Sequence, residues 1–415
     1  MSERNPQSVE IRPKYHTDYF ASRKLRARWR EWLPHDTADL LCDPNRLIVL
    51  DGDILLPNLG LSEPELDAIR NTTNIIIHAA SSINLGQPLN RLSGPIIEAT
   101  EMMADIAFTC KMLDRFVYVS TAYANTYLYS HSSEPDVRIN EEIYGLPSGC
   151  DALEELDEVR NYGTSMAHEA EDFPWAYAYA KNLTERLLAR RFSDSHEKLL
   201  IVRPAIIGPS QRLPFPGYNM PMSSPSTMIV ATLLLFPLSR IKIATRIEEP
   251  ELGVTADEVP VDVVADRLLC HLAMGTSGCV HAVSGARARG RFEPWRQSLM
   301  KLRQIPWELR PSWVKGYWKS PKQHSLSRFF AIFGTSFDFS EERTISMYQD
   351  MSEKDKVDLQ LFKQIDTGDQ ISARAEHIRY VMDRFARKSW VTWLILMLFY
   401  FNFGKPSQTS RYAKL

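Results

Sequence analysis

A tyrosine and a lysine, Tyr177 and Lys181, stand four residues apart in the segment WAYAYAKNLTE at 175–185. At this spacing both side chains lie on the same face of a helix. A phenol with a pKa of about 10 is too weak an acid by itself, and a neighbouring ammonium stabilises the phenolate. The pair therefore suits the protonation of the alkoxide that forms when hydride is delivered to a carbonyl.

Two adjacent hydroxyl residues, Ser120 and Thr121, follow the apolar run VYV at 117–119. Ligands of open α/β sheets bind beyond the carboxyl ends of the strands, so hydroxyls at this place are expected to face the cleft. We expect the Thr121 hydroxyl to hydrogen-bond the same carbonyl oxygen. A Tyr-x-x-x-Lys pair alone is weak evidence, and the preceding Ser-Thr at a strand end strengthens the catalytic interpretation.

Short apolar runs alternate with helical patterns over the first two thirds of the chain, which is typical of a parallel sheet covered on both faces. The predicted strands are 46–50, 74–80, 115–120 and 198–204, with a possible fifth at 8–12. The predicted helices are 23–32, 96–113 and 177–191. A polar, acidic segment at about 132–174 interrupts this rhythm and predicts an inserted lid or excursion, with a solvated charged helix as the alternative.

The composition excludes several classes of protein. The chain has 415 residues, of which 44% are hydrophobic and 24% charged, so it can build a sizeable core. A formal net charge of −2 gives no basic field, and nucleic-acid binding is not expected. Five scattered cysteines without a Cys-x-x-Cys spacing favour free or buried thiols over a metal site. The polar residues 1–16 carry no secretory signal, so we expect a location in the cytoplasm or on the cytoplasmic face of an intracellular membrane.

Beyond Gly290 the strand signals fade, while aromatic and basic residues accumulate. This change predicts a second, mainly helical unit over 291–415. Near its end, residues 390–403 (WVTWLILMLFYFNF) are apolar except for one threonine and one asparagine. A spanning helix needs about 20 apolar residues, so this run is short for a membrane span. An interfacial anchor, a re-entrant segment or an acyl-lining helix fits the run, and a buried core helix is the alternative.

Three further motifs accompany the Ser-Thr and Tyr-x-x-x-Lys residues. They are DGDI at 51–54, KLLIVRPAIIGP at 198–209 and DEVPVDVVADRLL at 257–269. With these motifs the chain resembles the fatty acyl-CoA reductases, a branch of the extended short-chain dehydrogenase/reductases related to thioester-reductase domains. The resemblance covers residues 12–285 and, more loosely, 325–380. It implies an α/β fold with a Rossmann-like, doubly wound parallel sheet over 1–290 and a mainly helical C-terminal domain over 291–415.

The resemblance also implies roles for individual residues. Thr121, Tyr177 and Lys181 would be catalytic. The cofactor would be bound by Arg12, Asp53, Ile54, His78, Ala79, Ala80, Ser120, Pro204 and Ala205. In that set Asp53 and Ile54 would flank the adenine, His78 to Ala80 would line the cleft, and Pro204 and Ala205 would lie beside the nicotinamide.

The cofactor and substrate follow from the same resemblance. Arg12 would contact a 2′-phosphate, and because a guanidinium suits a phosphate, NADPH is favoured over NADH. The alternative for Arg12 is a solvated arginine, and the alternative for His78 is a packed histidine without a chemical role. The implied reaction reduces a long-chain acyl-CoA, or a carrier-bound acyl thioester, through an aldehyde to a primary alcohol. No metal is expected.

The sequence departs from the family pattern in two places. The glycine-rich T-G-x-x-G-x-x-G turn is missing, and only eleven residues precede Arg12, so we expect an N-terminally incomplete sheet with unpaired ladder groups. Ile96 stands where the family usually has an asparagine. We expect either a truncated product or a divergent member. The alternative function is a catalytically impaired pseudo-reductase that binds acyl groups, a membrane or a partner; a sugar or sterol epimerase or dehydrogenase is a third.

Overall fold

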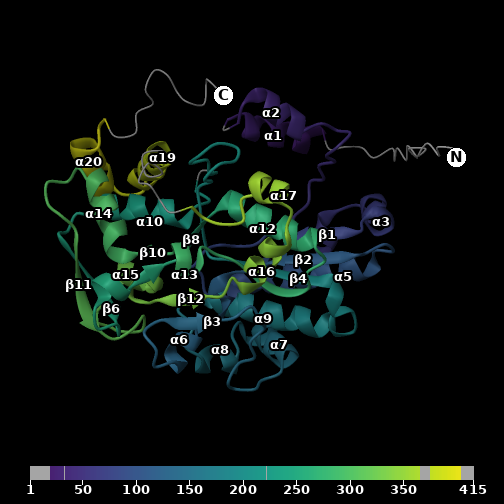
Figure 1. The fold of residues 1–415 in the computed structure, drawn as a ribbon, viewed down its shortest axis with the longest axis horizontal. Helices are drawn as coiled ribbons and strands as arrows, with labels where there is room; N and C mark the ends of the chain where they lie inside the picture. The colour runs from purple at the N-terminus through teal and green to yellow at the C-terminus, as the bar shows by residue number, and fades with distance from the viewer. Residues whose placement is uncertain (1–18, 32, 221, 365–373, 403–415) are drawn as a thin grey trace.

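The computed structural model describes residues 19–31, 33–220, 222–364 and 374–402. The predicted strand at 8–12 and Arg12 lie outside these residues. The described residues fold around one central sheet of parallel strands, with helices packed on it and a helical group at one end (Figure 1).

The central sheet has four parallel strands in the described residues. They follow the order β1 (Ile75–His78), β2 (Arg115–Val119), β4 (Leu199–Pro204) and β9 (Gly278–Ala282). Phe116 lies opposite Leu199, and Arg203 lies opposite His281, which fixes the register across the sheet. The strands predicted at 74–80, 115–120 and 198–204 are thereby confirmed. Their β-branched and aromatic side chains suit a sheet that is buried on both faces.

Helices cover both faces of the sheet, as predicted. They include α5 (Ala99–Thr109) and α9 (Ala176–Arg191), which pack on one face, and α12 (Val261–Ala273), which contacts β4 and β9. Phe116 and Tyr118 of β2 belong to the cluster that holds residues of α5 and α9. Val117, between them, points into the other cluster because successive strand residues face opposite sides. The chain therefore has the parallel, doubly covered α/β fold that the sequence predicts.

The edge of the sheet at β1 is apolar and exposed. Within the described residues β1 pairs only with β2, and Ile75 and Ile77 are 40% and 44% exposed. The strand predicted at 46–50 is not formed. A turn in which the amides of Arg46 and Leu47 donate to the carbonyl of Asp43 precedes 47–50, and these residues join no ladder with a described strand. Apolar character alone was an insufficient signal, because a strand also needs a partner.

The acidic segment predicted as a lid or a solvated helix packs against the body of the protein. It contains β3 (Val137–Ile139), α7 (Ala152–Tyr162) and α8 (Met166–Ala170). The Asp151 carboxylate caps α7 by accepting from the Leu153 amide, and Glu155 on its inner face is only 1% exposed. Glu155 accepts two hydrogen bonds from Arg186 of α9, at 2.6 and 2.7 Å. A buried ion pair therefore fixes this segment to α9.

Strands on the two sides of residue 290 pair with each other. Parallel pairs join β6 (Arg240–Thr245) to β11 (Arg310–Lys315) and β3 to β12 (Phe337–Phe339). Five helices lie between residues 225 and 399, and they are α10 (Pro225–Leu234), α14 (Phe292–Leu302), α16 (Glu342–Asp350), α19 (Ala375–Ala386) and α20 (Trp390–Phe399), beside shorter helices given below. The domain division near 290 stays a prediction. Among the described residues no helix combines the length and apolarity needed to cross a membrane.

The remaining elements are short or lie at the periphery. The α-helices are α1 (Tyr19–Arg30), α2 (His35–Leu41), α3 (Glu63–Thr72), α4 (Leu89–Leu92), α6 (Leu128–His131), α11 (Pro250–Gly253), α13 (Gly285–Ala288), α15 (Ser325–Phe329) and α17 (Glu353–Asp358). The short strands are β5 (Ile206–Gly208), β7 (Thr255–Ala256), β8 (Glu258–Pro260) and β10 (Gly290–Arg291). The 3-10 helices are Pro57–Gly60, Ala122–Asn125, Ser193–Lys198 and Ala331–Gly334, and residues Ser93–Glu98 form a π-helix. The helix predicted at 96–113 is thus a π-turn followed by α5.

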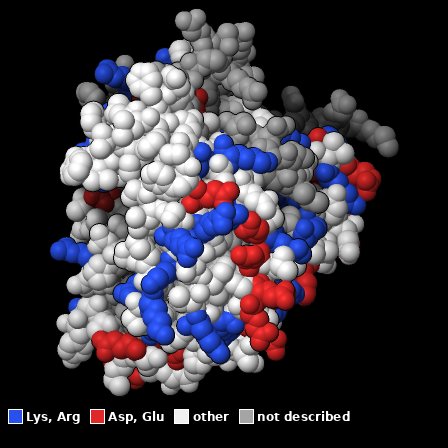
Figure 2. Space-filling view, turned by 90° about the vertical axis from the view of Figure 1, so that its left-hand side faces the viewer, with Lys and Arg blue, Asp and Glu red and all other residues white. Residues whose placement is uncertain are grey.

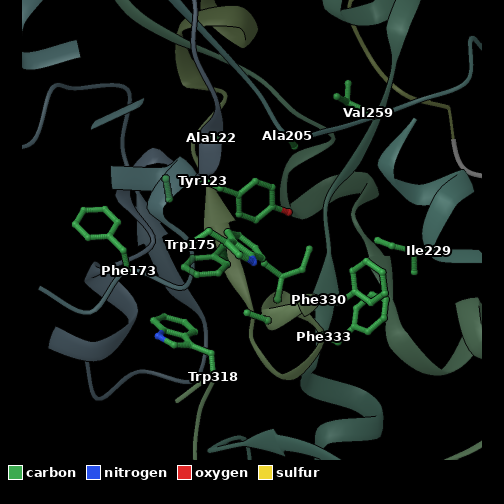
Figure 3. Close-up of a cluster of buried hydrophobic side chains, with 14 of the residues drawn as sticks. Ala122, Tyr123, Phe173, Trp175, Ala205, Ile229, Val259, Trp318, Phe330 and Phe333 are labelled. Carbon is green, nitrogen blue, oxygen red and sulfur yellow. The ribbon is translucent and has the colours of Figure 1, made fainter. Parts of the chain in front are cut away.

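The largest hydrophobic core joins the strand ends to the C-terminal elements. Figure 3 shows Tyr123, Trp175, Phe330 and Phe333 within this cluster. The Tyr123 ring centroid lies 5.2 Å from that of Phe339 in β12. Since Tyr123 follows the end of β2 by four residues, this core supports the edge of the sheet where the candidate site lies.

Candidate active site

The carboxyl ends of β1, β2 and β4 lie side by side, because these strands are parallel and adjacent. The amide of Ser120 donates to the carbonyl of Val202 at 2.8 Å, which continues the pairing one residue beyond β2. The amide of Ala205 donates to the carbonyl of Ala282 at 3.1 Å. Ser120 and Ala205 are therefore held at the same edge of the sheet by backbone hydrogen bonds.

Thr121 occupies the turn between β2 and the 3-10 helix Ala122–Asn125. Its side-chain oxygen caps this helix by accepting from the Tyr123 amide at 3.3 Å. The same hydroxyl donates to the carbonyl of Pro204 at 3.4 Å. The structure thus brings together two predicted site residues that lie 83 positions apart in the sequence.

Tyr177 lies in the first turn of α9 and is partly buried. Burial raises the pKa of its phenol to about 12, and a hydrogen bond with the Thr121 hydroxyl lowers the pKa by a smaller amount. The phenol is therefore neutral at physiological pH and keeps a proton that it can donate. Thr121 and Tyr177 meet, as a shared site for one substrate oxygen requires.

Lys181 lies one helical turn beyond Tyr177 and is only 2% exposed. Its ammonium donates to the carbonyl of Val119 at 3.0 Å and lies 4.7 Å from the centroid of the Tyr118 ring. Burial lowers the pKa of Lys181 to about 7, and the carboxylate of Glu185 opposes this change. Among the described residues no hydrogen bond joins the Lys181 ammonium directly to the Tyr177 hydroxyl, so the structure without ligands anchors this lysine on the end of β2.

A buried ion pair that the sequence did not reveal connects α9 to β4. Arg203 and Glu185 are 0% and 1% exposed and form two parallel hydrogen bonds of 3.0 and 2.6 Å. Arg203 directly precedes Pro204 on β4, and Glu185 lies one helical turn beyond Lys181 on α9. It therefore fixes the helix that carries Tyr177 relative to the strand end. The only signal in the sequence was the charge of Arg203 at the end of an apolar strand.

An open cleft of about 660 Å³ lies beside the ends of β1 and the 51–60 turn. Asp53, Ile54, Ala80 and Ser81 are among the residues that line it. The Asp53 carboxylate accepts from the Leu55 amide at 2.8 Å, which shapes the turn. The cleft has the size of a cofactor site, and three predicted cofactor residues, Asp53, Ile54 and Ala80, lie in its wall.

Ser120 gives a second indication of a ligand. Its hydroxyl oxygen is buried and has no hydrogen-bond partner among the residues that the structure describes. A buried hydroxyl without a partner is costly, and a bound ligand at this edge would supply one. The polar walls of the cleft at Asp53 and the buried Ser120 hydroxyl therefore fit the polar groups of a dinucleotide.

His78 is the last residue of β1, and its side chain is buried, with 4% of its surface exposed. Its Nε2 is 3.1 Å from the hydroxyl oxygen of Thr100, and its ring stacks on Tyr118. Burial, with a smaller contribution from the charge of Lys181, lowers the pKa of His78 to about 4, so the imidazole is neutral. Ala79 follows it and is exposed next to Ala80. These contacts are those of a packed histidine, and a direct role with the cofactor stays a prediction.

The position expected to hold an asparagine carries a fully apolar side chain. Ile96 is 1% exposed and lies in the π-turn before α5. Its carbonyl accepts a hydrogen bond of 2.6 Å from the Thr100 hydroxyl, whose oxygen lies 3.1 Å from Nε2 of His78, so Ile96 contributes only its backbone to these polar groups. Among the described residues no cluster of side chains could hold a metal ion.

Comparison with known proteins decides the family. A family profile of NAD-binding domains, described as "Male sterility protein", matches residues 11–268, more than half of the chain. The chain belongs to the male sterility protein family. That family is one of NAD(P)-binding oxidoreductases, and the chain is homologous to fatty acyl-CoA reductases, as the sequence motifs predicted.

Curated relatives match about 60% of the chain. Fatty acyl-CoA reductase 1 of Homo sapiens is 29% identical over 260 residues, which are 60% of this chain and 46% of that protein. Fatty acyl-CoA reductase 1 of Gallus gallus is 27% identical over 262 residues, 62% of this chain and 46% of that protein. The male sterility family member described here thus spans about half the length of the curated relatives it matches.

Solved structures support the fold. The terminal R domain of the myxalamid biosynthetic pathway superposes with a TM-score of 0.56 at 14% identity, covering 92% of this chain and 83% of that one. The reductase domain of the aureusimine cluster gives a TM-score of 0.53 at 14% identity, covering 89% and 82%. The predicted Rossmann-like architecture is confirmed at the level of the fold.

Proposed function

We propose that this member of the male sterility family reduces long-chain acyl thioesters, acyl-CoA or a carrier-bound thioester, through the aldehyde to the primary alcohol with NADPH. The observation that carries the proposal is the meeting of the Thr121 and Tyr177 hydroxyls at the carboxyl edge of β2 and β4, with Lys181 one turn away. The names of the homologous reductases support the substrate class.

The bound dinucleotide would supply one hydride to the acyl carbon of the thioester. The C–S bond would then break, releasing the CoA or carrier thiol and the aldehyde, and hydride from a second NADPH would reduce the aldehyde to the alcohol. Tyr177 would donate its proton to the oxygen that becomes negatively charged, since its raised pKa keeps the phenol protonated until that charge develops. Thr121 would hold the same oxygen through its hydroxyl. Lys181, charged at neutral pH and below, would stabilise the phenolate that remains on Tyr177.

The cofactor would lie along the edge of the sheet. Asp53 and Ile54 would contact its adenosine half in the cleft, and Ser120, whose buried hydroxyl has no partner among the described residues, would hydrogen-bond the other half. Pro204 and Ala205 would flank the nicotinamide beside Thr121. Arg12, outside the described residues, would select NADPH by binding the 2′-phosphate.

The first test is Tyr177→Phe, assayed as NADPH oxidation with palmitoyl-CoA and as alcohol formed. We expect activity to fall by about 10²–10⁴-fold, because only the proton donor is removed. Tyr179→Phe is the matched control: two residues along the same helix, its hydroxyl contacts Ser165 and Glu155 away from the site. Full activity of Tyr177→Phe in a folded protein would reject the proposal.

One observation favours a second function. Ile96 is a buried apolar side chain at the position where an asparagine was expected, and its lack of a polar group favours a site that has lost catalysis but still binds acyl chains. A folded wild-type chain that binds acyl-CoA but oxidises no NADPH would indicate this pseudo-reductase.

A further inference from the structure

The outer face of the β6–β11 pair carries exposed cationic side chains. Arg240 and Lys242 of β6 are exposed, whereas Ile241 between them is buried, because successive strand residues point to opposite sides. Arg310 of β11 is exposed and lies directly opposite Arg240 in the register of the pair. Like charges that face each other across two strands are destabilising, so this arrangement costs stability unless an anionic group covers it.

Two further cations lie at the other edge of β6. The amide of His324 donates to the carbonyl of Lys242 at 3.0 Å, which holds the exposed Lys322 beside this strand. Arg328 of α15 donates to the carbonyl of Pro321 at 2.9 Å, so its guanidinium lies next to Lys322. We call this surface the basic face; it consists of Arg240, Lys242, Arg310, Lys322 and Arg328.

The basic face has little negative charge to balance it. Arg310 pairs with Glu308 at 3.0 Å, but both side chains are more than half exposed, and such a pair contributes little. The other four cations form no ion pair with a carboxylate of the described residues. Figure 2 shows this side of the molecule, where Lys and Arg side chains lie in several groups. Since the whole chain has a formal net charge of −2, this is a local concentration of positive charge.

The segment after β11 joins the basic face to the candidate active site. Lys319 forms an ion pair with Asp172, and Trp318 belongs to the same buried cluster as Trp175 (Figure 3). Trp175 directly precedes α9 and lies two residues before Tyr177. A partner that binds the basic face would therefore contact a surface that is packed against the segment leading into the proton donor.

We propose that the basic face binds an acyl carrier protein with an acidic surface, and that this partner delivers the thioester that is reduced at Tyr177. The inference rests on the proposed reductase function and names the donor of its substrate. Free CoA is a small ligand that needs a concave site, whereas cations spread over two strands and a helix match an extended acidic protein surface. Arginines and an exposed aromatic side chain, Tyr317 at 37% exposure, are of the types enriched at protein interfaces.

The test is a binding titration of the full chain with a fluorescently labelled palmitoyl acyl carrier protein, in the absence of NADPH. We expect saturable binding that weakens in high salt. Arg240→Glu with Lys242→Glu should weaken it at least about tenfold, because like charges then meet across the interface. This variant places an opposite charge against Arg310, so its fold is expected to be kept. Lys111→Glu with Lys354→Glu makes the same change of charge at exposed positions outside the basic face and should bind like the wild type.

Turnover separates this inference from the reductase function. In the Arg240→Glu, Lys242→Glu variant, we expect KM for the palmitoyl carrier protein to rise at least about tenfold, with kcat and the KM for palmitoyl-CoA unchanged. Reduction of palmitoyl-CoA by a wild type that does not bind the carrier would overturn the docking and leave the reductase function standing. Carrier binding that is lost in the variant, without any NADPH oxidation by the wild type, would support the docking and reject the reductase function. Equal carrier binding by wild type and variant would overturn the docking, as would binding to phosphatidylserine vesicles in place of the carrier.

Discussion

The two halves of the candidate site are built differently. At the catalytic half, Lys181 and the Glu185–Arg203 pair are buried, and every charge has a partner within the chain. At the dinucleotide half, Asp53 is exposed on a turn, and β1 leaves Ile75 and Ile77 40% and 44% exposed at the sheet edge. The contrast teaches that the chain itself preorganises the proton-donating groups, whereas the cofactor edge presents exposed groups that a ligand would cover.

The largest effect is expected from breaking the buried ion pair. Arg203→Met leaves the Glu185 carboxylate buried without its partner, and we expect a loss of about 3–5 kcal/mol in the free energy of unfolding. Arg138→Met is the matched control, since Arg138 is 43% exposed and its pairs with Asp338 and Glu342 are worth about 0–1 kcal/mol. Chemical denaturation measures both. Equal losses in the two variants would contradict a preorganised catalytic half.

The pH dependence of activity sharpens the comparison at Lys181. Its pKa is lowered by burial from 10.5 to about 7, so the ammonium that stabilises the Tyr177 phenolate is lost as the pH rises through about 7. We expect kcat/KM to fall above that pH by up to tenfold per unit. Lys181→Arg stays charged, and its residual activity should lack this fall. A wild-type profile that is flat up to pH 9 would disagree with a catalytic ammonium.

The same pKa has a consequence for stability. Between pH 7 and 10.5 the unfolded chain binds the Lys181 proton and the folded chain does not, so this group makes the free energy of unfolding rise with pH across that window. Relative to Lys181→Met, the wild type should therefore gain stability from pH 7 to pH 10 in thermal unfolding.

At the dinucleotide half, Asp53→Ala should act on the cofactor and little on the fold. The carboxylate lines the cleft and holds the turn through the Leu55 amide. We expect about tenfold weaker NADPH binding, the value of one hydrogen bond to a charged group, in a tryptophan-quenching titration. Asp51→Ala is the control, because Asp51 lines the same cleft on the other side of Gly52. If both variants weakened NADPH binding equally, the effect would come from the loss of negative charge and not from a specific contact of Asp53.

The smallest effect is expected at the open edge. Ile77→Thr replaces a side chain that is 44% exposed, and we expect a change within about 0.5 kcal/mol. Ile76→Thr, one residue earlier and 8% exposed on the covered face, should cost about 1–3 kcal/mol. A large loss from Ile77→Thr would mean that this edge is covered in the folded protein.

Local patterns predicted most of the catalytic half. β2, β4 and α9 follow from apolar runs and helical periodicity, and with them the positions of Thr121, Tyr177 and Lys181. The Glu185–Arg203 pair was beyond prediction, because it depends on how α9 packs against β4.

The sequence was less informative where pairing partners decide the structure. Residues 46–50 are as apolar as a strand, yet no described strand pairs with them. Residues Arg310–Lys315 carry a proline and a serine and were expected in a mainly helical unit, but they pair in register with β6. Whether a segment forms a strand therefore depends on the strand it pairs with as much as on its own residues.

The most direct test of the central claim follows a labelled hydride. The full chain would be incubated with palmitoyl-CoA and NADPH deuterated at C4 of the nicotinamide, and the products examined by mass spectrometry. We predict deuterium on C1 of hexadecanol, with almost no product from Tyr177→Phe. A folded protein that binds NADPH but places no label in aldehyde or alcohol would contradict the assignment of Thr121, Tyr177 and Lys181 as a working reductase site.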